Sequence, residues 1–370
     1  MRKLMISTST AVHGAVFSTL LIASTGAYAN EVVSGSPSQQ PGSQISPADA
    51  AAAQAPQGRI LTSPTQLTEK VRSVLGLPNT DVGLEAFGGG LEGKPHPFTT
   101  VRASADKDPT PTNKYPWSPT GKLFMKFGND TFVCTASVIR KGLLVTAAHC
   151  VHNFGEGDGG FADSIMFQPA RYESSIPFGT WTGKQWWIPK VYFDGTDHCS
   201  TEAPGVVCEN DVAVLVVEEN DAGEFIGDVT GIYDFKDGDY GYPIFLGEKA
   251  TEFTQLGYPS KNFDGDKMVR TDSLGYQDDP NNVVIGSNQT GGSSGGPWLQ
   301  NFGTETIDFT GTPPNDADPN QVTGTTSWGF IADTFKVQGA SRFAKNTTFT
   351  VESNIQTLVD AACAANPGFC

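Results

Sequence analysis

From about residue 122 onward, the chain is a series of short apolar runs separated by residues that favour turns. Five of these runs lie at residues 122–127, 132–139, 143–146, 212–217 and 282–285. Their length and their content of β-branched residues are typical of strands. The chain also contains 42 glycines and 24 prolines, which suits a fold with many tight connections. The pattern predicts an all-β sandwich or barrel.

One clear helix is predicted near the C-terminal end, over residues 352–364. Its apolar residues recur at helical spacing and would form one stripe, made of Ile355, Leu358, Val359 and Ala362. Ser353 precedes this stripe and is a suitable N-cap, because a serine hydroxyl accepts a hydrogen bond from an orphan amide of the first turn.

The first 29 residues have the organisation of a signal peptide. Two basic residues precede an apolar stretch at residues 11–23, which is followed by residues 27–29 (AYA). We predict cleavage after Ala29. A membrane anchor is the alternative, but the stretch is short, and His13 and Ser18 interrupt it. We therefore expect a secreted protein, extracellular or periplasmic, with no membrane attachment after signal cleavage.

The region between the signal peptide and about residue 100 has a different texture. Residues 30–58 are rich in Ala, Gln, Ser, Pro and Gly, and we expect them to be disordered. A short helix is predicted at residues 64–75. We interpret residues 30–100 as a propeptide, with an approximate C-terminal boundary. The alternative is an accessory N-terminal extension that the mature protein keeps.

The chain is acidic, with a formal net charge of −16 at pH 7. This charge argues against nucleic acid or an anionic membrane surface as a partner. We expect a monomer.

Six cysteines fit an exported protein, because disulfides persist in oxidising compartments. Their positions favour three short-range bridges: Cys134–Cys150, Cys199–Cys208 and Cys363–Cys370. The sequence has no C-x-x-C motif, which disfavours both a zinc site and a redox site.

Three motifs carry residues suited to nucleophilic catalysis. They are residues 146–150 (TAAHC), 210–215 (NDVAVL) and 290–297 (TGGSSGGP). A serine hydroxyl needs an adjacent base, so we assign Ser294 as nucleophile and His149 as general base and acid. Asp211 would hold the imidazole in the useful tautomer. The glycines around Ser294 allow a sharp turn, so that the amides of Gly292 and Ser294 would form an oxyanion hole.

In this order, the three motifs resemble those of the chymotrypsin-like serine peptidases, and the resemblance covers roughly residues 110–364. Cys134 precedes Cys150 by 16 positions, as in that family's bridge beside the catalytic histidine. Ser327, Trp328 and Gly329 resemble its substrate-binding strand. Residues 115–118 (YPWS) and 290–292 (TGG) are most similar to the secreted bacterial branch that includes the glutamyl endopeptidases.

The resemblance implies a peptidase domain at residues 101–370 with two six-stranded antiparallel β-barrels and a C-terminal helix. The first barrel would span about residues 110–225 and supply His149 and Asp211. The second would span about residues 240–350 and supply Ser294. It also implies an endopeptidase that acts on proteins or peptides through an acyl-enzyme, without a cofactor or a metal.

The sequence departs from the family pattern at the activation and specificity positions. Ser293 stands where trypsin has an aspartate that pairs with the freed N-terminus, so activation by that ion pair is not expected. Thr326 stands where the glutamyl enzymes have a histidine, so glutamate specificity is not supported. The resemblance places Asn288 at the base of the S1 pocket, where trypsin has an aspartate. An uncharged P1 residue is therefore predicted.

The sequence is also compatible at first sight with two other functions. Residues 292–296 also match the G-x-S-x-G elbow of lipases, but that class places its histidine after the serine, and all five histidines here precede Ser294. A catalytically silent binding module with a protease fold stays open, although no triad member is missing.

Three further features of the sequence have a structural explanation. His152 lacks a third metal ligand nearby, and we expect a surface histidine. Acidic clusters at residues 156–158 and 237–239 are interpreted as solvated turns, because they lack an EF-hand ligand pattern. The insertion that contains Trp181, Trp186 and Trp187 is interpreted as a surface loop packed by its own aromatics.

Overall fold

The computed structural model describes residues 31–55, 96–103, 112–200, 204–238, 244–245, 248–262, 265–278, 281–304, 318–329 and 336–370. The first barrel of this structure consists of β3 (Thr120–Phe127), β4 (Asp130–Arg140), β5 (Leu143–Thr146), β6 (Ser164–Pro169), β7 (Trp181–Pro189) and β8 (Ala213–Val217). These strands pair in the order β7-β6-β3-β4-β5-β8, and pairing of β7 with β8 closes the barrel.

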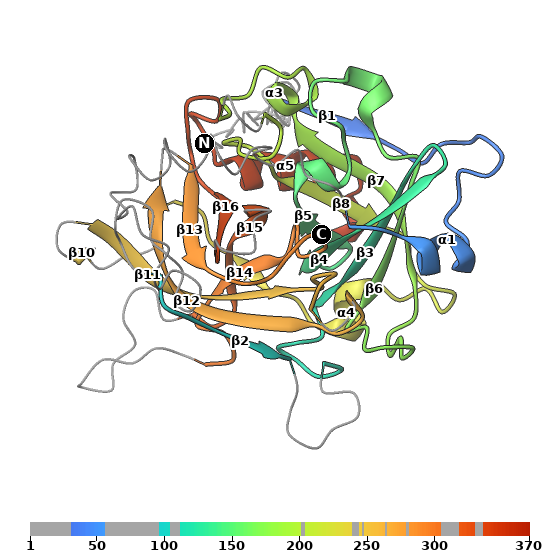
Figure 1. Ribbon diagram of the computed structural model, residues 1–370. Helices are drawn as coiled ribbons and strands as arrows, with labels where there is room; N and C mark the ends of the chain where they lie inside the picture. The colour runs from blue at the N-terminus through green and yellow to red at the C-terminus, as the bar shows by residue number, and fades with distance from the viewer. Residues whose placement is uncertain are drawn as a thin grey trace, which may run out of the picture.

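The second barrel has the same construction. It consists of β11 (Glu248–Gly257), β12 (Val269–Asp278), β13 (Asn282–Gly286), β14 (Pro297–Gln300), β15 (Gln321–Gly329) and β16 (Val337–Arg342). All these strand pairs are antiparallel, and β11 closes the barrel on β12. Figure 1 shows the two barrels side by side. The prediction of two six-stranded antiparallel barrels is confirmed.

The C-terminal helix α5 (Asn354–Ala365) packs against β7 and β8 of the first barrel. Ser353 caps it, since its hydroxyl accepts a hydrogen bond from the amide of Gln356 at 3.2 Å. Each residue of the predicted apolar stripe is buried, namely Ile355, Leu358, Val359 and Ala362. The helix therefore forms for the reason that the sequence indicated: it covers one face of the core with a single stripe.

Shorter elements occupy the connections. They are α3 (Lys190–Phe193), α4 (Ile226–Thr230), the 3₁₀ turns η2 (Ala148–Cys150), η3 (Gly157–Gly160) and η5 (Pro367–Phe369), and the short strands β9 (Asp234–Phe235) and β10 (Ile244–Phe245). Among the residues described, no helix combines the length and the apolar character needed to cross a bilayer.

The tryptophans between His149 and Asp211 do not lie in a surface loop. Trp181, Trp186 and Trp187 all belong to β7, and each is at most 4% exposed. They alternate between the interior of the first barrel and the core shared with α5, because β7 is covered on both faces. The interpretation as a self-packed surface loop is wrong: these residues form the core of the barrel.

The N-terminal region contributes a strand to each barrel. β1 (Val32–Gly35) pairs with β7, and α1 (Pro47–Ala52) lies against β4. The expectation of disorder is therefore wrong for residues 31–55. The helix expected at residues 64–75 lies outside the described residues.

β2 (Phe98–Arg102) pairs with β12 of the second barrel, from Ser273 to Val269. Ala103, directly after the strand, is buried and joins the core. The boundary expected between residues 100 and 101 thus falls inside a paired strand.

Candidate active site

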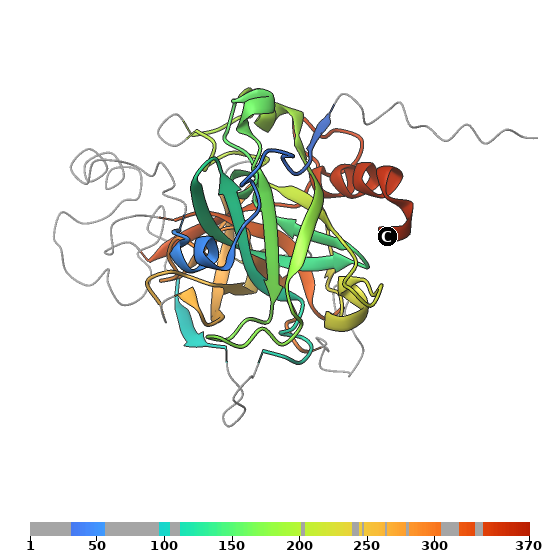
Figure 2. The same ribbon diagram turned by 90° about the vertical axis from the view of Figure 1, so that its right-hand side faces the viewer.

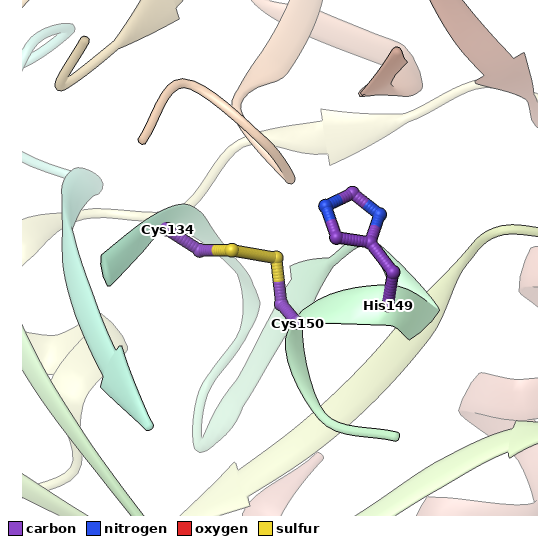
Figure 3. Close-up of side chains that lie close together, drawn as sticks. All are labelled: Cys134, His149 and Cys150. Atoms are coloured by element: carbon purple, nitrogen blue, oxygen red, sulfur yellow. A yellow bond between two sulfur atoms is a disulfide. The ribbon is translucent and has the colours of Figure 1, made fainter. Parts of the chain in front are cut away.

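His149 lies in the 3₁₀ turn η2, immediately after β5 ends at Thr146. A disulfide between Cys134 of β4 and Cys150 of this turn holds it against the barrel, with 6.3 Å between the two Cα atoms (Figure 3). The His149 side chain is 11% exposed. The turn therefore presents a largely covered imidazole from a fixed backbone position.

Asp211, just before β8, is fully buried and contacts this imidazole. Its Oδ2 lies 2.7 Å from His149 Nδ1, and its Oδ1 accepts a hydrogen bond from the His149 amide at 2.8 Å. Ser327 Oγ lies 2.5 Å from Asp211 Oδ2. A carboxylate beside Nδ1 favours the tautomer that carries its proton there, which leaves the lone pair of Nε2 free to accept a proton.

Ser294 lies in the turn between β13 and β14, and this turn is anchored to both barrels. Its carbonyl oxygen accepts a hydrogen bond from the amide of Thr135 in β4 at 2.7 Å. The amide of Gly295 donates to the carbonyl of Thr326 in β15 at 2.7 Å. The side chain of Ser294 is half-buried. The described contacts include no hydrogen bond between Ser294 Oγ and His149 Nε2; in unliganded sites this bond is often long.

Gly295 sets how closely the two barrels approach at this point. Its φ is +75°, and a Cβ there would lie 1.9 Å from Thr146 Oγ1 and 2.4 Å from the Thr135 carbonyl oxygen. Thr146 is three residues before His149. Glycine at position 295 is therefore what allows the Ser294 turn to lie against the segment that carries His149.

The backbone amides of Gly292 and Ser294 have no acceptor within the described part of the chain, and the same holds for Asn288, Thr290 and Gly291 of this connection. In contrast, the amides of Ser293, Gly295 and Gly296 donate to carbonyl groups at 2.7–3.1 Å. Gly292 has a φ of +98°, which favours glycine, and its carbonyl accepts a hydrogen bond from Thr135 Oγ1. The amides of Gly292 and Ser294, which flank Ser293, are the pair expected to bind an oxyanion.

The residues expected to bind substrate take different positions. Ser327 is 2% exposed and faces Asp211, so its hydroxyl supports the acid in addition to any backbone contact with substrate. Trp328 Nε1 donates to Asn282 Oδ1 at 3.2 Å. At Gly329 a Cβ would lie 3.1 Å from Gln338. Asn288 is half-buried, and its buried Oδ1 atom has no hydrogen-bond partner among the residues that the structure describes.

A buried glutamine network behind Ser293 was not foreseen. Gln255 donates through Nε2 to Thr326 Oγ1 at 2.9 Å and to Gln338 Oε1 at 2.5 Å, and it accepts a hydrogen bond from Ser287 at 2.8 Å. Gln338 in turn donates to the carbonyl of Gln289 at 2.9 Å. All these side chains are neutral and at most 8% exposed. No local motif marks them, because they meet only through strand register.

A clamp on the residue before Asp211 was also not foreseen. Asp197 is 8% exposed, and its carboxylate accepts hydrogen bonds from both the amide and the side-chain Nδ2 of Asn210, each at 2.8 Å. Burial raises the pKa of Asp197 to about 6, and the hydrogen bonds from Asn210 oppose this rise. Asn210 Oδ1 accepts a hydrogen bond from Asn346 Nδ2 at 2.7 Å. Asn210 is thus held on two sides.

The Cys199–Cys208 disulfide lies close to the Asp197 carboxylate, and the segment before Cys208 reaches the candidate triad. The carbonyl of Val206 lies 2.5 Å from Ser327 Oγ, and the carbonyl of Gly205 accepts a hydrogen bond from the buried hydroxyl of Tyr192 at 2.6 Å. The third expected bridge, Cys363–Cys370, ties the end of α5 to the C-terminus.

His152 is buried, so the expectation of a surface histidine is wrong. Its Nε2 lies 2.7 Å from the carbonyl oxygen of Gly157, and its ring packs against Phe161 and Phe193. Burial lowers the pKa of His152 below its usual value. Aromatic side chains that are distant in the sequence cover it, which the local sequence does not reveal.

Two groups of possible metal ligands occur among the described residues. They are Cys134 with His149 and Cys150, and Asp197 with Cys199 and Cys208. All four cysteine sulfurs are in disulfides and are not free thiolates. Each group thus keeps one ordinary metal donor, which is too few for the four-ligand sites that zinc prefers.

No protein-family model matches the chain. Among curated proteins, the extracellular metalloprotease of Bacillus subtilis (strain 168) is 33% identical over 88 residues, which are 23% of this chain and 27% of the relative. The match thus spans about a quarter of that relative's length.

Among solved structures, the protease Anisep from Arthrobacter nicotinovorans aligns with a TM-score of 0.49 and 22% identity, over 68% of this chain and 97% of that one. The thermostable serine protease AL20 from an extremophilic microorganism aligns with a TM-score of 0.49 and 22% identity, over 67% of this chain and 99% of that one. A Glu endopeptidase aligns with a TM-score of 0.46 and 17% identity, over 72% of this chain and 96% of that one. Likeness at these identities concerns the fold alone.

Proposed function

We propose that the chain is a secreted serine endopeptidase in which Ser294 is the nucleophile, His149 the general base and acid, and Asp211 the residue that orients His149. The observation that carries this proposal is the buried Asp211 carboxylate, which contacts His149 Nδ1 at 2.7 Å while the Ser294 turn is anchored beside the same segment. A buried carboxylate held against a histidine in this way is the orienting half of a triad.

In the proposed reaction, Ser294 Oγ attacks the carbonyl carbon of the scissile peptide bond, and His149 Nε2 takes the hydroxyl proton. The negative charge that forms on the carbonyl oxygen is stabilised by the amides of Gly292 and Ser294. His149 then gives its proton to the leaving amine, which departs and leaves an acyl-enzyme on Ser294. Water, deprotonated by His149, hydrolyses this ester and restores the serine.

The test is covalent labelling with a fluorophosphonate, which reacts with an activated serine. We expect labelling at Ser294 in the wild type, its loss in Ser294→Ala, and a strong decrease in His149→Ala because the base is absent. A catalytically silent binding module would leave the wild type unlabelled. Activity that a chelator abolishes, with Ser294 unlabelled, would instead indicate a metallopeptidase.

Export and processing belong to the same proposal. Residues 1–29 would direct secretion, and a cut near residue 100 would break the covalent connection between the N-terminal region and the peptidase domain. Ser293 Oγ already donates to the carbonyl of Thr290 at 2.8 Å, so the turn has a partner that does not depend on a new N-terminus. We therefore expect fluorophosphonate labelling of the uncut chain, lacking only its signal peptide, at a rate similar to that of the cut protein.

A further inference from the structure

Residues 31–55, which we call the strap, lie across the outside of the first barrel. In sequence order the strap contacts β7, then the start of β6, then β3 and β4. Figure 2 shows this blue segment running over the green strands of the barrel. Four of the six barrel strands thus contact one continuous piece of chain.

The strand β1 fills a gap in the barrel wall. β6 pairs with β7 only at Trp181 and Thr182. Further along β7, Trp186 and Trp187 pair with β8 on one edge of the strand. On the opposite edge, where β6 no longer pairs with β7, they pair with β1. Because an unpaired strand edge is a site for strand addition, β1 completes the hydrogen bonding of β7.

The side chains of β1 are fitted to this position. Val32 is 9% exposed and packs in the same core cluster as Trp187, while Val33 packs on the cluster inside the barrel. At Gly35 a Cβ would lie 2.5 Å from Trp186 Nε1 and 2.6 Å from Phe161 Cδ1. Only glycine allows the strand to lie this close.

Polar contacts continue along the strap beyond β1. The amide of Ser38 donates to the carbonyl of Asp163 at 2.7 Å, and Ser164 Oγ donates to the carbonyl of Ser43 at 2.5 Å. Ser43 is 7% exposed. The Ser43 amide, hydroxyl and carbonyl each have a hydrogen-bond partner. The strap is therefore held at the start of β6 without leaving a buried polar group of Ser43 unpaired.

The last part of the strap is held by a nearly buried lysine and a second strand contact. Lys126 of β3 has a side chain that is 9% exposed, and its Nζ lies 3.2 Å from Asp49 Oδ2 and 3.4 Å from the carbonyl oxygen of Gln44. Gln54 bonds to β4 through both backbone groups, with its amide 3.0 Å from the Thr131 carbonyl and its carbonyl 2.8 Å from the Val133 amide.

These contacts all lie on the strands and turns of the first barrel, and none of the described ones involves His149, Asp211 or Ser294. We propose that the strap completes the first barrel by adding a strand to β7, and that it stays bound to the barrel after the chain is cut between the strap and the barrel. The partner for this surface is thus the chain's own residues 31–55. The proposal does not depend on the proposed catalysis.

The test uses the full chain with the substitution Ser294→Ala and a recognition site for a sequence-specific viral protease placed within residues 56–95. After cutting, gel filtration in native buffer and intact mass spectrometry should find the strap with the body in equal amounts. Release of the strap from this protein, which has no substitution in β1, would overturn the proposal.

Variants of β1 test where the strap is anchored. Val32→Asp places a charge in the core, so we expect release of the strap after the cut and a thermal midpoint lower by about 5 °C or more. Ser34→Asp adds the same charge at an exposed position of the same strand and should retain the strap. If Val32→Asp does not fold, Val32→Ala gives the same comparison in milder form. Equal retention by the Val32 variant and the Ser34 control would show that β1 is not the anchor.

Discussion

Asp197 binds Asn210 through two hydrogen bonds of 2.8 Å, one to its amide and one to its side chain. Asn210 is the residue directly before Asp211, so its position fixes where the candidate triad acid begins. The pair is buried, and the Asp197 carboxylate lies close to the Cys199–Cys208 disulfide. Asp197 is therefore a positioning residue for Asp211 in the proposed mechanism.

Asp197→Asn is expected to lower kcat about tenfold with little change in KM, because it displaces Asp211 and His149 without touching substrate. The asparagine keeps the size of the side chain but turns an NH₂ group toward the donors of Asn210. Asp194→Asn, at an exposed carboxylate of the same segment, is the matched control. Steady-state kinetics on a peptide substrate gives both constants. Equal kcat values for the two variants would show that Asp197 does not position Asp211 for catalysis.

The same carboxylate predicts a pH dependence of stability. The pKa of Asp197 is raised to about 6, mainly by burial and also by the charge of Glu209. Between about pH 4 and about pH 6 the folded protein therefore holds a proton that the unfolded chain has lost, so this group makes the free energy of unfolding fall as pH rises. Above that window the charged form costs stability.

We expect Asp197→Asn to abolish this contribution, measured by urea unfolding of Ser294→Ala protein at about pH 4.5 and about pH 6.5. His152, whose pKa is lowered by burial, makes stability rise with pH, but equally in both proteins. The difference between the two proteins in how the free energy of unfolding changes with pH therefore gives the contribution of Asp197 alone. Parallel slopes would mean that its carboxyl group does not titrate in this range.

Gly295→Ala is expected to separate the Ser294 turn from the His149 segment. The new methyl group would meet Thr146 Oγ1 and the Thr135 carbonyl, and the φ of +75° is unfavourable for alanine. Overpacking and backbone strain together should lower the free energy of unfolding by about 2–4 kcal/mol, with loss of fluorophosphonate labelling.

Gly128→Ala is the control for this substitution. Its φ is +59°, and a Cβ there has no neighbour within 4 Å, so the variant measures the backbone cost alone, about 1 kcal/mol. If the two variants were equally stable and equally labelled, the close contact at Gly295 would have no role.

Much of the fold was accessible from the sequence because its signals are local. The strand at residues 143–146, the stripe on α5 and its cap at Ser353 each depend on neighbours within a few positions. The three short-range disulfides join cysteines 7 to 16 positions apart. His149 and Asp211, which the structure brings into contact, each lie beside a strand end that the apolar pattern marks.

What the sequence did not indicate depends on contacts between distant segments. Val32 pairs with Pro189, so the composition of the strap gave no sign of its order. Gln255 and Gln338 meet only because β11 and β16 belong to one closed barrel. His152 is buried by the ring of Phe193, about forty positions away. Such placements follow from tertiary packing, which local propensity does not encode.

Removal of the Cys134–Cys150 bridge by the double substitution Cys134→Ser and Cys150→Ser should destabilise the protein and release η2. A loop of this size accounts for about 3 kcal/mol of unfolding free energy if strain is small. Urea unfolding measures this loss, and labelling at Ser294 should fall because His149 is less fixed. The double variant at Cys363 and Cys370 should leave labelling unchanged, since that bridge ties the end of α5 to the C-terminus and does not hold the turn that carries His149.

The last prediction concerns the side chain that precedes the scissile bond. The resemblance places Asn288 at the pocket base and Thr326 where the glutamyl enzymes have a histidine. Thr326 Oγ1 already accepts hydrogen bonds from Gln255 Nε2 and Trp298 Nε1, each at 2.9 Å, and donates to the carbonyl of Gly296 at 3.2 Å. It therefore has no group left for a substrate carboxylate.

The glutamine network behind Ser293 is neutral, so it offers no charge to pair with an ionised P1 side chain. Burying an unpaired charge costs several kcal/mol, which predicts a preference for uncharged P1 residues, at least about a hundredfold in kcat/KM over Glu, Arg or Lys. A peptide library varied at P1 measures this ratio. A strong preference for Arg or Lys would require a carboxylate from elsewhere; Asp308 and Asp333, which lie outside the described residues, are the candidates to substitute. In that case Asn288 would not be the residue that determines specificity.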